Sequence, residues 1–291
     1  MKFLLALNAI GIPTEELLAL SRQAEASGFD GVLLGDHVAM PAEVSAQAPY
    51  TRDGKPPMDL STAWPECLTA CGVVLGATTR LRVISSVLVL PMRQPLLVAK
   101  SAHTLAVMSG GRFVLGVGSG WLAEEFAALG QPYAARGART DEAIAILRQA
   151  RGGEVEHHGA HYDIARVSLL PAPDPPVPIY VGGESEAALA RAARLGDGYL
   201  STLRTRATLQ KRLARIQELR EAAGRADAPF EFIGVPADAA TPDEFAALAD
   251  AGIGSAAVIA WKAGYERDDP PLAQKLERIE AFAERIVRPL A

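Results

Sequence analysis

Short apolar runs alternate with longer amphipathic runs along the whole chain. The short runs are rich in Val, Ile and Leu, which is typical of buried parallel strands. Strands are predicted at Phe3–Ala9, Gly31–Gly35, Leu81–Leu90, Arg112–Val117, Ile179–Val181, Gly198–Ser201, Phe230–Val235 and Ala256–Ala260. Helices are predicted at Thr14–Ser27, Ala63–Ala77, Pro95–Met108, Thr140–Arg151, Ser185–Leu195, Thr208–Ala223, Pro242–Ala251 and Leu272–Val287. Eight β/α alternations predict a single (β/α)8 TIM barrel over residues 1–291, because a doubly wound sheet needs fewer strands.

Three helix starts carry recognisable capping residues. Thr14 and Ser185 each precede glutamate and are predicted N-caps, with acid in the first turn. Thr241 followed by proline predicts a third N-terminus, since proline is favoured at the first helical position.

Two segments interrupt the β/α rhythm. Val38–Asp59 follows the second strand and is predicted to be an active-site loop. Glu154–Pro178 is predicted to be a hairpin insertion before strand 5, running into a Pro-rich approach to that strand. The insertion holds His157, His158 and His161, but their spacing matches no common metal-binding pattern, so no metal site is expected.

Composition narrows the functional classes. Among 291 residues, 34 acidic and 29 basic side chains give a mild net charge of −5, without a long basic run. This argues against nucleic acid or an anionic membrane as partner. The apolar N-terminus is broken at Asn8, and no stretch approaches the ~18 apolar residues of a membrane helix. The two cysteines, Cys67 and Cys71, fit reduced thiols packed in a helix, so a cytoplasmic protein is expected.

Candidate chemistry lies at the carboxyl ends of predicted strands. Asp36 and His37 close the second strand, where a barrel places its active site. Histidine is the side chain best suited to exchange a proton near neutral pH. Ser85 and Ser86 interrupt the third strand and require hydrogen-bond partners or an unusual backbone.

Two glycine-rich turns follow later strands. The fourth strand runs into Gly118-Ser119-Gly120-Trp121 and then a short helix carrying Glu124 and Glu125. The glycine spacing does not match the G-x-G-x-x-G dinucleotide fingerprint, which excludes that interpretation. The fifth strand ends at Gly182 and Gly183, directly before a helix, an arrangement suited to binding an anion such as phosphate.

Several of these segments together resemble one known family. The stretches AEASGFDGVLLGDHV, TTRLRVISSVLVLPMRQPLLVAKSAHTL, SGGRFVLGVGSGWLAEEFAALG, RGARTDEAIAILR and PPVPIYVGGESEAALARAARLGDGYL are similar to the luciferase-like monooxygenase superfamily. Its members are flavin or deazaflavin TIM-barrel oxidoreductases. The GDH and GVGSGWLAEEF segments look like branches that use coenzyme F420, the deazaflavin.

The resemblance implies roles around the cofactor ring. His37 would be the catalytic residue, near the reactive ring carbon and the substrate, and Asp36 would help to hold the ring. A non-proline cis peptide supports the ring in this family, and it corresponds here to Ser86 and Val87.

The resemblance also implies the remaining cofactor contacts. Gly182 and Gly183 would receive the cofactor phosphate. The turn Gly118, Ser119 and Gly120 would run beside the ring edge, and Glu124 matches a cofactor-contacting polar position.

Trp64 and Trp121 are expected to shape the substrate pocket. Some deazaflavin sugar dehydrogenases carry an acid where this chain has Trp121, so their acid/base arrangement does not transfer. FMN-dependent members often have Asn where this chain has Leu122, which favours deazaflavin over FMN.

These observations lead to one principal functional hypothesis and two alternatives. The principal hypothesis is hydride transfer between coenzyme F420 and an unidentified small organic substrate. The alternatives are an FMN-dependent monooxygenase using reduced flavin and O2, and a non-catalytic cofactor-binding paralogue. A homodimer is expected through the helix Ala63–Ala77, which is apolar on more than one face.

Overall fold

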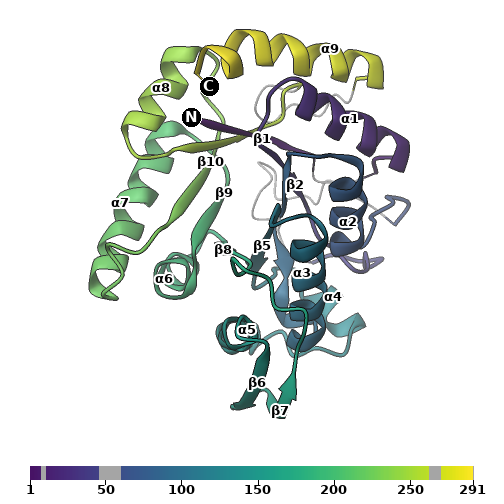
Figure 1. Cartoon of the computed structure of the whole chain (residues 1–291), viewed down its shortest axis with the longest axis vertical. Coiled ribbons are helices and arrows are strands. Elements are labelled where there is room, and N and C mark those ends of the chain that lie inside the picture. Colours follow the sequence, from purple (N-terminus) through teal and green to yellow (C-terminus); the bar gives the residue numbers. More distant parts are fainter. Residues whose placement is uncertain (8–10, 46–59, 262–269, 291) are drawn as a thin grey trace.

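Eight parallel strands form a closed barrel (Figure 1). The computed structural model describes residues 1–7, 11–45, 60–261 and 270–290. The barrel strands are β1 (Lys2–Ala6), β2 (Gly31–Leu34), β3 (Arg82–Ser85), β5 (Phe113–Gly118), β8 (Ile179–Gly182), β9 (Gly198–Arg204), β10 (Glu231–Pro236) and β11 (Ser255–Val258). Each strand pairs in parallel with the next, and β11 pairs with β1 to close the circle. The predicted (β/α)8 barrel is therefore confirmed.

Helices cover the outside of the barrel and follow the predicted order. They are α1 (Thr14–Ala26), α2 (Cys67–Ala77), α3 (Pro95–Met108), α4 (Ala123–Ala128), α5 (Arg136–Ala150), α6 (Glu186–Leu195), α7 (Arg206–Ala222), α8 (Pro242–Asp250) and α9 (Leu272–Phe282). A π-helical turn (Ala283–Val287) continues α9. Among the described residues, no helix is both long and apolar enough to cross a membrane.

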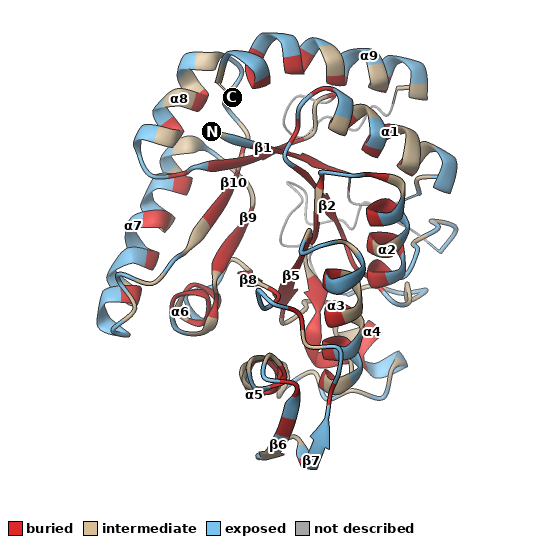
Figure 2. Ribbon diagram, in the orientation of Figure 1, coloured by how far each residue is buried: buried red, intermediate tan, exposed pale blue. Residues whose placement is uncertain are grey.

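The strands separate two apolar layers by their alternation. In β1, Leu4 and Ala6 point into the barrel, whereas Phe3 and Leu5 point outward to the helices. The interior is filled by side chains from all eight strands: Leu4, Ala6, Leu33, Ile84, Val114, Tyr180, Leu200, Ile233 and Ala257. Figure 2 shows the barrel strands buried and the outer faces of the helices exposed. The barrel is thus a packed core, and ligands must bind at its ends.

Local chemistry explains most helix starts. The Ser185 hydroxyl accepts from the N–H of Ala188 at 3.2 Å, which confirms that predicted N-cap. The helix start predicted at Thr241 is confirmed too, and Thr241 forms a capping box there with Glu244. The prediction for Thr14 was wrong, because α1 already begins at that residue and Pro13 precedes it without a side-chain cap.

The third predicted strand is divided into two. β3 ends at Ser85, the peptide bond between Ser86 and Val87 is cis as expected, and a short β4 (Leu88–Val89) continues alongside β5. A 3₁₀ turn (Leu90–Met92) follows. The Ser85 hydroxyl is satisfied inside the sheet, accepting from the Gly116 N–H at 3.0 Å and donating to its carbonyl at 2.9 Å.

The segment between α5 and β8 contains an antiparallel hairpin. Its strands are β6 (Glu154–His158) and β7 (Asp163–Ser168), and they lie beyond α5 at the lower end of Figure 1. No group of three potential metal ligands occurs anywhere in the described ranges, this hairpin included.

Candidate active site

His37 lies at the carboxyl end of the barrel, three residues after β2 ends. Its side chain is only 7% exposed, and its Nδ1 is 2.7 Å from Oε2 of Glu125. Glu125 is completely buried and comes from α4, 88 positions along the chain. The barrel mouth therefore contains a buried imidazole–carboxylate pair.

Glu125 also holds the loop that follows β2. Its Oε1 accepts from the backbone N–H groups of Val38 at 2.5 Å and Ala39 at 3.2 Å. These bonds satisfy a carboxylate that is otherwise removed from water, as a buried acid requires.

Two tryptophans flank His37. The Trp64 ring lies edge-on at a centroid distance of 4.6 Å, and the Trp121 ring lies edge-on at 6.1 Å. Trp64 precedes α2 and Trp121 follows β5, yet the fold places both next to the same imidazole. The two tryptophans predicted to shape the substrate pocket therefore lie beside the histidine predicted to be catalytic.

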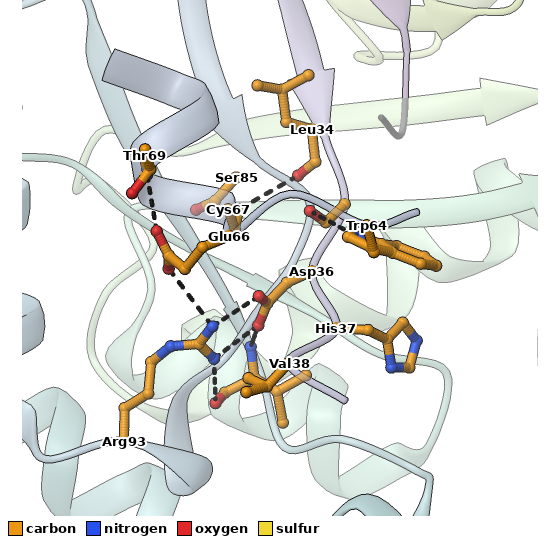
Figure 3. Close-up of polar contacts among 12 residues, drawn as sticks. Leu34, Asp36, His37, Val38, Trp64, Glu66, Cys67, Thr69, Ser85 and Arg93 are labelled. Atoms are coloured by element: carbon orange, nitrogen blue, oxygen red, sulfur yellow. Dashed lines mark hydrogen bonds and ion pairs between the residues drawn. The ribbon is translucent and has the colours of Figure 1, made fainter. Parts of the chain in front are cut away.

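Asp36 points away from His37, as Figure 3 shows. Its two oxygens each lie 2.7 Å from the guanidinium of Arg93, and Oδ2 also accepts from the Val89 N–H at 2.8 Å. Glu66 adds a weaker ion pair to Arg93 at 3.6 Å. Both oxygens of Asp36 therefore accept hydrogen bonds from other residues of the protein. The bond to Val89 links the loop after β2 to β4.

Val87 lies between two of the predicted cofactor-binding glycines. A Cβ at Gly118 would lie 2.6 Å from Cγ2 of Val87, and a Cβ at Gly182 would lie 2.6 Å from its Cγ1. Only glycine permits this approach without moving Val87. The valine following the cis bond thus packs on top of the barrel interior and forms an apolar platform at the mouth.

The turn after β5 is held by a buried arginine. The Ser119 hydroxyl receives a hydrogen bond from Arg191 at 3.1 Å and lies 3.2 Å from the Thr140 hydroxyl. Gly120 has a φ of +77°, and a Cβ there would lie 2.6 Å from Val89. These contacts fix the path of the backbone between β5 and α4.

Glu124 lies beside Glu125 but faces a different partner. Its Oε1 accepts from the N–H of Ser45 at 2.8 Å and from the Ser45 hydroxyl at 2.5 Å. Those hydrogen bonds, the hydroxyl's foremost, lower the pKa of Glu124. Its Oε2 is enclosed and has no hydrogen-bond partner among the described residues.

Gly183 leads into the N-terminus of α6. The φ of Gly183 is +134°, a region that favours glycine, and the Ser185 cap follows. Between them, Glu184 binds Arg212 and, at 2.6 Å, Arg204. Burial alone would raise the pKa of Glu184, but hydrogen bonds from Arg212 and Thr202 and the two arginine charges lower it to about 2.

Two residues of this site escaped the sequence reasoning, namely Glu125 and Arg93. The neighbouring Leu122 and Phe126 are both buried, so the helical pattern around Glu125 could have indicated that it faces inward. The partners of Glu125 and Arg93 lie 88 and 57 positions away, and no local signal marks such pairs.

The fold and site together define an α/β-barrel protein with a protonatable group at its mouth. The chain matches the family model described as luciferase-like monooxygenase over residues 3–288 and therefore belongs to this family.

Two curated relatives differ in how far the similarity extends. An uncharacterized protein of Mycobacterium tuberculosis is 37% identical over 273 residues, covering 93% of this chain and 94% of the relative. The F420-dependent glucose-6-phosphate dehydrogenase of Beutenbergia cavernae is 34% identical over 192 residues, covering 64% of this chain and 52% of that enzyme.

Solved structures share the fold at low identity. The tetrahydromethanopterin reductase of Methanopyrus kandleri, described as coenzyme F420 dependent, has a TM-score of 0.75 at 14% identity, covering 100% of this chain and 99% of that one. An F420-dependent secondary alcohol dehydrogenase, in complex with an F420-acetone adduct, has a TM-score of 0.74 at 18% identity, covering 98% of each chain. The monooxygenase RslO1 of Streptomyces bottropensis has a TM-score of 0.74 at 21% identity, covering 100% of both chains.

Proposed function

We propose that this protein is an F420-dependent oxidoreductase that transfers hydride between coenzyme F420 and a small organic substrate. The observation that carries the proposal is the placement of His37, buried at the barrel mouth between Trp64 and Trp121. The similarity to F420-dependent glucose-6-phosphate dehydrogenases supports deazaflavin as the cofactor. Membership in an oxidoreductase family makes the non-catalytic alternative the least supported of the three hypotheses.

The residues at the mouth fit a flat heteroaromatic ring. Val87 provides an apolar platform, and Gly118 and Gly182 lie on either side of it. When bound, the deazaflavin supplies or accepts the hydride, while the protein positions it and excludes water.

The chain's own side chains would divide the remaining tasks. His37 would hold or accept a proton at Nε2, the nitrogen that Glu125 does not occupy. Gly182 and Gly183, between the end of β8 and the N-cap of α6, would receive the cofactor phosphate through backbone N–H groups. Trp64 and Trp121 would present an apolar, aromatic surface to the substrate.

Comparative cofactor binding tests this proposal. Purified protein is titrated with oxidised F420 and with FMN in parallel, by fluorescence or calorimetry. Tight F420 binding with weak FMN binding is expected. Binding of neither cofactor would overturn the catalytic interpretation and would favour a non-catalytic protein.

A monooxygenase using reduced FMN and O2 is the second candidate. It is favoured by the structural similarity to the monooxygenase RslO1 across the full length of both chains. Tight FMN binding, followed by oxygen consumption with reduced FMN, would select this function instead.

We further propose that the protein is a cytoplasmic homodimer that pairs through α2 and α3. These neighbouring helices expose apolar side chains, with Val73 42%, Leu97 69% and Met108 83% exposed in the single chain. Exposed large apolar residues on neighbouring elements are typical of a protein–protein interface.

A further inference from the structure

We infer that Glu125 is a positioning residue that fixes His37 in the tautomer with its proton on Nδ1, leaving Nε2 to exchange protons with the substrate. The inference rests on the proposed function for its catalytic consequence. Its structural part, the tautomer, depends only on this chain.

The hydrogen-bond roles at Glu125 are set by the backbone. Val38 and Ala39 donate N–H groups to Oε1, and a backbone N–H can act only as a donor. This identifies Oε1 of Glu125 as an acceptor, in a side chain that is fully buried. An anionic carboxylate fills that role and gains charge-assisted hydrogen bonds, which are stronger than neutral ones.

The acceptor role of Glu125 determines the role of His37. A carboxylate has no proton to donate, so the 2.7 Å contact requires Nδ1 of His37 to be the donor. In a neutral imidazole with Nδ1 protonated, Nε2 carries the lone pair. No described residue hydrogen-bonds to Nε2, so this nitrogen remains available for a proton.

The surroundings also fix the orientation of the ring. Trp64 and Trp121 both pack edge-on against the imidazole, and Glu125 holds one of its edges. In acid/base catalysis, a carboxylate often orients a histidine and selects its tautomer by accepting a hydrogen bond from one ring nitrogen.

A purely structural role for Glu125 would be to tie α4 to the loop after β2. The substitution Glu125→Gln separates the two roles. The Gln amide oxygen can still accept from Val38 and Ala39, which preserves the loop. Its NH₂ group then faces His37 and must donate to Nδ1, which moves the imidazole proton to Nε2.

The test is long-range ¹H–¹⁵N correlation spectroscopy of ¹⁵N-histidine-labelled protein without cofactor, at about pH 8.5, where an ordinary imidazole is neutral. The chain has 5 histidines, and the His37→Asn variant assigns the signal. We expect the Nδ1–H tautomer in the wild type and in the neighbouring control Glu124→Gln, and the Nε2–H tautomer in Glu125→Gln. A wild-type His37 in the Nε2–H form overturns the inference, even if the variant fails to fold. An unchanged tautomer in folded Glu125→Gln also overturns it.

Steady-state kinetics then test the catalytic consequence. Glu125→Gln should lower kcat by about 100-fold, within the range of acid/base contributions, while the KM for the cofactor stays close to the wild-type value. An unchanged kcat with an altered tautomer would remove Glu125 from the mechanism. Failure to bind any cofactor would instead overturn the proposed function and leave the tautomer result standing.

Discussion

Both ends of the barrel contain buried or half-buried charged networks, but only the network at the amino end is complete. At the amino end, Glu231 binds the guanidinium of Arg82 at 2.9 and 3.1 Å and also binds the hydroxyls of Tyr180 and Ser255. Arg82, Glu231 and Ser255 are each the first residue of their strand. Every partner in this cluster comes from the barrel itself.

At the carboxyl end, the networks stop short of such completion. Asp36 and Arg93 satisfy one another, but within the described part of the chain only Nδ1 of His37 has a hydrogen-bond partner, and its Nε2 has none. A saturated polar network stabilises a fold, whereas an unsaturated one at the mouth of a barrel is available to a ligand. Under the proposed function, this contrast fits a stabilising role for the amino end and a ligand-binding role for the carboxyl end.

The largest expected effect is at the mouth. If the proposed function holds, His37→Ala should reduce turnover by about 100-fold or more, because it removes the proton-transferring group. Cofactor affinity should be largely retained, since the phosphate and ring contacts lie elsewhere. Steady-state kinetics and a binding titration measure both quantities. His158→Ala on the exposed hairpin is the control, and unchanged turnover in His37→Ala would contradict this role.

At the amino end, we expect the converse pattern. Glu231→Ala leaves the half-buried Arg82 and the Tyr180 hydroxyl without their acceptor, and should lower the free energy of unfolding by about 2–3 kcal/mol. Urea denaturation measures this change, and the specific activity of the folded fraction should remain near wild type. Arg166→Ala removes an ion pair of 2.6 Å, with Glu154, from the exposed hairpin and should have a much smaller effect. Equal losses of unfolding free energy in the two variants would show that the network at the amino end stabilises the fold no more than a surface ion pair does.

The pH dependence of stability tests the same network. Burial alone would raise the pKa of Glu231, but hydrogen bonds and charge from Arg82, with help from Ser255 and Tyr180, lower it from 4.5 to about 2. The stability that Glu231 contributes is therefore present above about pH 4.5 and is lost as the pH falls toward about 2. Thermal unfolding between these pH values should show a shallower slope for Glu231→Gln than for the wild type. Identical slopes would mean that Glu231 does not carry this dependence.

The smallest expected effect on activity comes from a substitution on the outer surface, at α2. Val73→Asp introduces a charge on the exposed face of α2 and should convert a dimer to a monomer if this face is an interface. Light scattering at micromolar concentration measures the mass. Val167→Asp, on the outer surface of the hairpin, is the matched control. A wild-type monomer would dispose of the proposed pairing.

Much of the fold could be predicted because its signals are local. Apolar runs and capping residues such as Ser185 and Thr241 depend on neighbours within a few positions. The resemblance to the family also predicted the cis peptide bond between Ser86 and Val87, which no hydrophobic pattern reveals. The Thr14 cap prediction was wrong because threonine and proline can both stand at a helix start, and the local pattern does not decide at which residue the helix begins.

The sequence by itself determined the order of strands and helices, and it placed His37, Gly118 and Gly182 at strand ends, because periodicity and glycine turns act over short distances. Only the tertiary structure decided which side chains meet at those ends. It turned Asp36 toward Arg93 and brought Glu125 across 88 positions to His37. Closure of a barrel places the carboxyl ends of all its strands side by side, so partners far apart in sequence become neighbours through packing that no local pattern encodes.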